Sequence, residues 1–277
     1  MLKSILNKIS WLSLDVVFGG LAGMYFFSRL LRVELSIEPY ALLALAIWSV
    51  YTFDHLQDAR RVPSGSNWDR HEFHLQNRIP LTVLLLAAII TGLILGIWYF
   101  GFGPTLYLSV GLAAVILLIM VLIRNFSTQA AWLKEINTAI FYIIGIAWLP
   151  FYKAEAIDLN APVWLLAAVY LGLATLNLLM LSYLDEEKDR QDGSHSILTF
   201  LPKEKLGRVI RTATIILLVF AAGMGIAFLS FYRIFALILF LMISIHYLSF
   251  FNQNFSSERK RVQMELIFSL PWVLAFF

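Results

Sequence analysis

The sequence reads Asp185-Glu186-Glu187-Lys188-Asp189-Arg190-Gln191-Asp192-Gly193 at the point where a long apolar segment, residues 162–184, ends. A second acidic stretch, Asp54-His55-Leu56-Gln57-Asp58, ends the apolar residues 40–53 in the same way. Each stretch holds two aspartates four residues apart, so one more helical turn places both carboxylates on the same helix face. We therefore expect a helical scaffold that brings two acidic helix ends together.

The composition indicates a membrane protein. The chain has 277 residues, of which 60% are hydrophobic and only 14% are charged, and its mean hydropathy is +0.78. These values lie far from those of soluble domains. The net charge of +3 does not indicate nucleic acid, because basic residues in a membrane protein usually mark cytoplasmic loops. The absence of cysteine excludes disulfides, thiolate metal sites and cysteine nucleophiles.

Nine apolar runs predict membrane-spanning helices. A spanning helix needs about 20 largely apolar residues. We therefore predict an all-α, polytopic membrane protein with nine transmembrane helices around a central cavity, and we treat residues 1–277 as a single domain. The last run is the shortest and is barely long enough to cross. The expected helices cover residues 11–27, 37–53, 81–100, 104–123, 136–152, 162–184, 212–230, 234–251 and 262–277.

Loop charges and loop lengths indicate the orientation. With the N-terminus inside, 17 of the 21 Lys and Arg residues fall on the inner side, as the positive-inside rule predicts. We expect an integral multi-pass protein, in the inner membrane if the cell is bacterial, with its N-terminus and both acidic stretches facing the cytoplasm. The acidic stretches follow the second and sixth helices, which indicates two four-helix pseudo-repeats and a ninth helix.

Paired aspartates at a membrane surface suit Mg²⁺, which commonly takes one or two carboxylates and completes its shell with water and phosphate oxygens. Two facing pairs can hold ions around a diphosphate, while nearby basic side chains contact its remaining oxygens. A diphosphate neutralised in this way is a better leaving group. Because the bundle beyond the site is apolar, a polyprenyl diphosphate has a suitable shape. The candidate ligands are Asp54, Asp58, Asp185 and Asp189.

The second acidic stretch resembles a motif of the UbiA superfamily of intramembrane prenyltransferases. That family also has nine helices, with its two motifs after the second and sixth. Asp54 and Asp58 match the last two aspartates of its first motif. Five residues between positions 181 and 197 fall in register with its second motif, namely Asp185, Asp189, Arg190, Gly193 and Ser196.

The chain departs from the family pattern at the start of both motifs. A polar pair such as Asn-Asp usually stands four residues before the first retained aspartate, whereas this chain has Val50-Tyr51 and Leu181-Ser182. Either the metal site has fewer oxygens, or the activity has changed, or a neighbouring side chain substitutes. The neighbours that we consider are Tyr51, Tyr183, Asp192 and Asn177.

The resemblance implies Mg²⁺-dependent transfer of a prenyl group from an isoprenyl diphosphate to an aromatic or quinone-precursor acceptor within the membrane. Its partners would be that diphosphate, a lipophilic acceptor and the bilayer, with no nucleic acid and no protein partner expected. Arg78, Lys134 and Arg190 would bind the diphosphate. The four aspartates, Asp54, Asp58, Asp185 and Asp189, would be the catalytic metal ligands.

Three alternatives stay open. A terpene cyclase on the same scaffold would let the prenyl chain attack itself and would need no acceptor. A non-catalytic membrane protein would account for Val50 and Leu181. A transporter-like protein would also show repeats, although its substrate site is expected near the midplane on broken helices.

Three ionisable residues, Asp15, His246 and Glu265, lie inside expected spans, where such groups are costly and often functional. We expect Asp15 to snorkel or to act where nearby glycines permit close helix approach. Glu265 is spaced to pair with Arg261, four residues earlier. The glycines beside Asp15 are Gly19, Gly20 and Gly23.

Overall fold

The structure of the protein, a computed structural model, describes residues 8–61, 69–125, 131–191 and 196–277. Its description of side chains omits residues 60–61, 69–71, 124–125, 131–133 and 188–191. Every regular element in the described ranges is helical, which confirms the predicted all-α class. The elements are α2 (Leu14–Leu30), α3 (Ile37–Arg61), α4 (Asp69–Gln76), α5 (Arg78–Phe100), α6 (Pro104–Asn125), α7 (Ala131–Lys153), η2 (Ala156–Asp158), α8 (Ala161–Gln191), η3 (Ile197–Thr199), α9 (Lys203–Ala227), α10 (Ser230–Phe251), α11 (Ser257–Ile267) and η4 (Leu270–Phe276).

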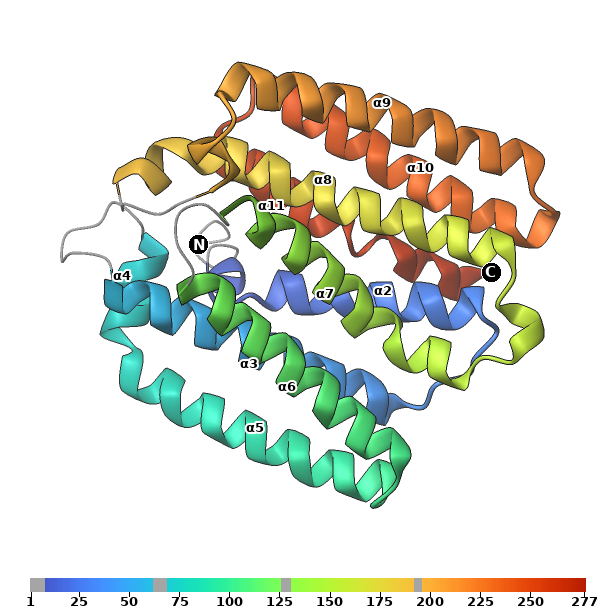
Figure 1. Cartoon of the computed structure of the whole chain (residues 1–277), viewed down its shortest axis with the longest axis horizontal. Helices are drawn as coiled ribbons and strands as arrows, with labels where there is room; N and C mark the ends of the chain where they lie inside the picture. Colours follow the sequence, from blue (N-terminus) through green and yellow to red (C-terminus); the bar gives the residue numbers. More distant parts are fainter. Residues whose placement is uncertain (1–7, 62–68, 126–130, 192–195) are drawn as a thin grey trace.

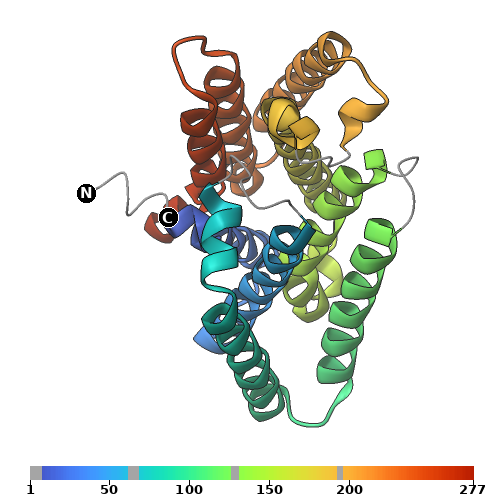
Figure 2. The same ribbon diagram turned by 90° about the vertical axis from the view of Figure 1, so that its left-hand side faces the viewer.

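The long helices lie roughly side by side in one bundle (Figure 1). Helix α2 occupies its middle and packs against α3, α7, α11 and η4. Helix α8 packs against α7, α9 and α10, and the hairpin of α9 and α10 forms one edge of the bundle. Helices α5 and α6 form the opposite edge, as Figure 1 and the end view in Figure 2 show.

Aromatic side chains fill the core where α2, α8 and α10 meet. Phe26 of α2 is fully buried, and its ring makes edge contacts with Tyr170 of α8 and Phe235 of α10 at centroid distances of 5.2 and 5.3 Å. Edge-to-face pairs of this kind stabilise a core beyond the area that they bury. The interface of α2, α8 and α10 is therefore a packed aromatic cluster.

The glycines of α2 let neighbouring segments approach its backbone, as the sequence predicts. A Cβ atom at Gly19 would lie 2.8 Å from Cβ of Phe268, and one at Gly23 would lie 2.6 Å from Cδ1 of Ile146. Ile47 of α3 would similarly meet a side chain at Gly20. Small residues thus allow α3, α7 and the C-terminal segment to converge on α2.

Six of the described helices are long and apolar enough to cross a membrane. They support an integral, multi-pass membrane protein, whereas the predicted count of nine spans is not confirmed by the described residues. Helix α2 has only 17 residues, and α3 carries the polar residues of the first acidic stretch in its last turns. The six spans are Arg78–Phe100, Pro104–Ile123, Lys134–Lys153, Ala161–Glu187, Lys203–Ala227 and Ser230–Phe251.

The structure differs from the predicted helices in two places. The run 262–277 is not one helix, because α11 ends at Ile267 and the chain continues as the 3-10 helix η4. Pro271 has no N–H group, and its ring conflicts with the carbonyl of Ile267 in a continuous α-helix. Residues 69–76, which lie between the expected helices 37–53 and 81–100 and were assigned to neither, form the short helix α4.

Candidate functional site

The two acidic stretches lie at the same end of the bundle. Helices α3 and α8 both end at the left-hand side of Figure 1, and Figure 2 looks onto that end. Helix α7 begins there and packs against both α3 and α8. The first turns of α7 therefore lie between the helices that carry the two stretches.

The first acidic stretch forms a compact set of potential metal ligands on α3. One ligand atom from each of Asp54, His55 and Asp58 lies within 4.8 Å of the others. The helical spacing predicted from the sequence produces this cluster, because residues four apart share a helix face. Both carboxylates are partly buried, while His55 is buried.

His55 has partners that position its ring. Its Nε2 atom lies 3.1 Å from Oγ of Ser13, and its ring lies 5.2 Å from that of His74 between centroids. His74 belongs to α4 and is almost fully buried. Neither partner was predicted from the sequence, because α4 was not expected and Ser13 precedes α2 without a recognisable motif.

In the second acidic stretch, Asp185 already has a cationic partner. The guanidinium group of Arg261, on α11, forms an ion pair with the Asp185 carboxylate. Nη1 of Arg261 also lies 3.9 Å from Oε1 of Glu265, which confirms the predicted pair one helical turn apart. The predicted site residues Asp189 and Arg190 belong to α8, but their side chains lie outside the described part.

Glu135 holds the structure around the second acidic stretch together. Its Oε1 atom accepts hydrogen bonds from Oγ of Ser182 at 2.9 Å and from the backbone N–H of Ile197 at 3.1 Å. Glu135 is buried at the start of α7, and these bonds tie α7 to α8 and to η3. Because these residues are distant in sequence, no local pattern indicates this role.

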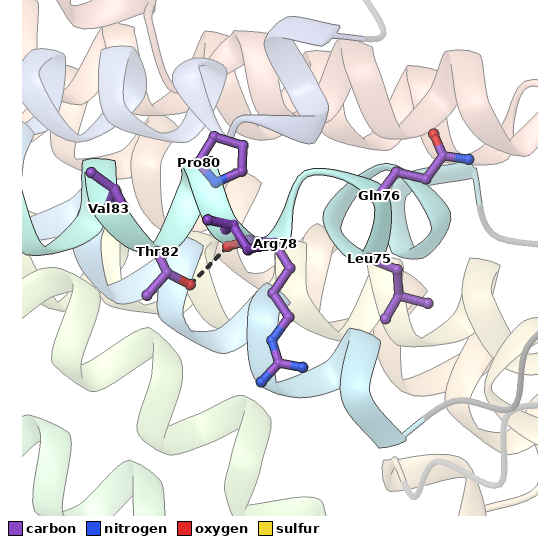
Figure 3. Close-up of a pocket in the computed structure, with 7 residues that line it drawn as sticks. Leu75, Gln76, Arg78, Pro80, Thr82 and Val83 are labelled. Carbon is purple, nitrogen blue, oxygen red and sulfur yellow. Dashed lines mark hydrogen bonds between the residues drawn. The ribbon is translucent and has the colours of Figure 1, made fainter.

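The two predicted diphosphate ligands with described side chains, Arg78 and Lys134, are both exposed at helix starts. Arg78 begins α5 and lines a shallow groove of about 690 Å³ together with residues of α4 and α5. Figure 3 shows its guanidinium group extending away from Pro80, while its backbone carbonyl accepts a hydrogen bond from Thr82 at 2.8 Å. Lys134 directly precedes Glu135 near the start of α7.

Three ionisable groups away from the acidic stretches each make a hydrogen bond to the backbone. Asp15 is buried and its Oδ1 atom accepts the backbone N–H of Val16 at 2.9 Å, near the N-terminus of α2. His246 is fully buried, with Nδ1 2.9 Å from the carbonyl oxygen of Met242. Lys260 donates to the carbonyl oxygen of Phe250 at 2.7 Å, and burial lowers the pKa of its ammonium group.

The donor set on α3 fits Mg²⁺, whereas Asp185 fits it less well. Asp54 and Asp58 offer two carboxylates on one face, as hard cations prefer. Asp185 is engaged by a guanidinium group, so its charge is compensated within the protein. The second acidic stretch is thus bound to a cationic side chain of the protein through Asp185, while the first stretch offers the set of three ligand atoms.

Comparison with known proteins identifies the fold. The structure of a UbiA homolog from Aeropyrum pernix K1, in its apo form, is similar to this chain with a TM-score of 0.59. The likeness covers 94% of this chain and 98% of that protein, at 14% sequence identity. This chain has the UbiA fold.

The UbiA fold is recognised through structure rather than through sequence. No protein-family model matches the sequence, and no curated protein matches it significantly. The resemblance inferred from the acidic stretches is confirmed in the fold, over nearly the whole chain. At 14% identity this likeness is evidence of architecture, so the chemistry must be argued from the residues.

Proposed function

We propose that this UbiA-fold protein is a Mg²⁺-dependent intramembrane prenyltransferase. It would transfer a prenyl group from an isoprenyl diphosphate to an aromatic or quinone-precursor acceptor. The observation that carries the proposal is the ligand cluster of Asp54, His55 and Asp58, at the bundle end where α8 presents its own acidic stretch. The shared fold and the apolar spans support a reaction within the bilayer.

In the proposed reaction the allylic C–O bond breaks and its electron pair leaves with the diphosphate. A carbon of the acceptor attacks the resulting cation and then loses a proton. Asp54 and Asp58 would hold Mg²⁺, which when bound neutralises the diphosphate and makes it a better leaving group. Arg78, Lys134 and Arg190 are proposed to bind the remaining phosphate oxygens.

The residues around the ligands have a supporting role. Ser13 and His74 fix the ring of His55, which limits the movement of the helix turn between Asp54 and Asp58. Glu135 holds Ser182 and the backbone of Ile197, and so fixes the base of the second acidic stretch. Positioning of this kind lowers the cost of organising the reactive groups.

The test is a direct assay of purified protein in lipid nanodiscs. Farnesyl or geranylgeranyl diphosphate is supplied with a lipid extract as the source of acceptor, with Mg²⁺ or with EDTA. Pyrophosphate release is measured and the lipid products are identified by mass spectrometry. We expect Mg²⁺-dependent release together with a prenylated acceptor.

Other products would decide between the remaining functions. Release together with a cyclic hydrocarbon, and without a prenylated acceptor, would identify a terpene cyclase. No release from either diphosphate would contradict the proposal and favour a non-catalytic or transporter-like protein.

A further inference from the structure

We propose that Arg261 is a built-in cation that takes the place of a metal ion at Asp185. In this arrangement divalent cations bind through Asp54 and Asp58, while the charge of Asp185 is compensated by α11. The inference rests on the proposed function, since it concerns the charges around a bound diphosphate. Metal ions supply the positive charge at the first acidic stretch, and Arg261 supplies it at the second. It makes Arg261 part of the site, although Arg261 follows Asp185 by 76 residues in the sequence.

The contact is sheltered and has a second carboxylate beside it. The side chains of Arg261 and Asp185 are only 16% and 18% exposed. Glu265, whose side chain is 11% exposed, lies 3.9 Å from the other terminal nitrogen of the guanidinium group. A planar guanidinium group suits carboxylates well, and a partly buried pair is screened far less by salt than an exposed one.

Packing fixes the position of Arg261. Ser256 caps α11 by accepting the backbone N–H of Arg259 at 3.3 Å, and Lys260 is bonded to the carbonyl oxygen of Phe250. Met264, one turn after Lys260, is fully buried. The helix turn that carries Arg261 is therefore anchored on both sides, and the guanidinium group is held against α8.

On α8, the described side chains one turn before Asp185 do not favour a metal ion. One turn earlier the chain has Leu181, which offers no oxygen ligand. The hydroxyl of Ser182 is engaged with Glu135 at 2.9 Å. A dication at Asp185 would also have to lie beside the positive guanidinium group, which is unfavourable. On α3, by contrast, three potential ligand atoms lie together.

The test counts Mn²⁺ bound to the full chain in nanodiscs of neutral lipid, using the electron paramagnetic resonance signal of free Mn²⁺. Arg261→Gln is expected to bind one more ion per chain than the wild type, because it exposes the Asp185 carboxylate. The double variant Arg261→Gln/Asp185→Asn is expected to return to the wild-type number. Arg261→Lys keeps the positive charge and is the matched control, with no gain.

A second measurement separates this gain from a folding defect. Mn²⁺ should raise the Tm of Arg261→Gln above its metal-free value by more than it does in the double variant. Asp185→Asn alone, in which Arg261 keeps Glu265 within reach, should bind Mn²⁺ as the wild type does. If Asp185→Asn loses an ion, or if folded Arg261→Gln gains none, the inference is wrong. Should Arg261→Gln fail to fold, the Asp185→Asn measurement decides.

Failure of this inference is distinguishable from failure of the proposed function. The difference between Arg261→Gln and the wild type depends only on what Asp185 binds. Prenyl transfer, and its loss in Asp54→Asn, depends on the α3 cluster. Active enzyme that loses an ion in Asp185→Asn would refute the built-in cation alone, whereas an inactive protein with the expected Mn²⁺ counts would refute the prenyltransferase alone.

Discussion

Asp54 and Asp58 are the side chains whose removal should change turnover most. If each holds a cation on the diphosphate, Asp54→Asn and Asp58→Asn should each lower product formation by about 10²-fold or more, as loss of a group that acts in the transition state does. Product formation in nanodiscs is the measurement, with thermal unfolding to confirm that the protein is folded.

The matched control is an aspartate at the other end of the bundle. Asp158 of η2 lies 3.8 Å from Arg32, whose side chain is 60% exposed, and pairs of this kind contribute little. Asp158→Asn should therefore keep wild-type turnover. Equal losses in Asp158→Asn and Asp54→Asn would show that the effect is not specific to the α3 cluster.

The two hydrogen bonds that Glu135 accepts should stabilise the fold. In Glu135→Ala the hydroxyl of Ser182 and the backbone N–H of Ile197 lose their acceptor, which should lower the free energy of unfolding by about 1–3 kcal/mol. Glu135→Gln keeps an acceptor oxygen and should lose less. Unfolding in mixed micelles measures both variants, and equal losses would contradict the assigned bonds.

Neighbouring segments pack closely against helix α2. Alanine substitutions at Gly19 of α2 and at Gly145 of α7 should therefore differ in their effect on stability. Gly19→Ala should destabilise the bundle by about 1–3 kcal/mol, because the new methyl group meets Cβ of Phe268, an atom that no rotamer change can move. Gly145→Ala on α7 has no atom within 4 Å and should be nearly neutral. Thermal unfolding of both variants tests this, and equal stability would contradict the packing.

The elements follow from the sequence to different degrees. The apolar runs predict the long helices, and the i, i+4 spacing predicts the α3 ligand cluster, because both are local patterns. The break after Ile267 was missed although Pro271 indicates it, since the apolar run alone suggests one span. The ion pair of Arg261 with Asp185 joins helices distant in sequence, so it depends on tertiary packing that no local pattern encodes.

In the molecule as a whole, the orientation in the membrane stays a prediction from loop charges. Because the chain has no native cysteine, single cysteines can report it directly. Lys205→Cys, at the bundle end of the acidic stretches, should react with a membrane-impermeant maleimide only after the membrane is permeabilised. Ile157→Cys, which is 80% exposed at the other end, should react in intact cells. The reverse labelling pattern would invert the topology.

The change from α11 to η4 alters how far the C-terminal segment reaches. A 3-10 helix rises about 2.0 Å per residue, whereas an α-helix rises about 1.5 Å. Laid end to end, the 11 residues of α11 and the 7 of η4 therefore extend roughly 30 Å, close to the thickness of the hydrocarbon layer. The tighter winding of η4 thus lets the C-terminal segment reach farther along the bundle than the same number of residues would in one continuous α-helix.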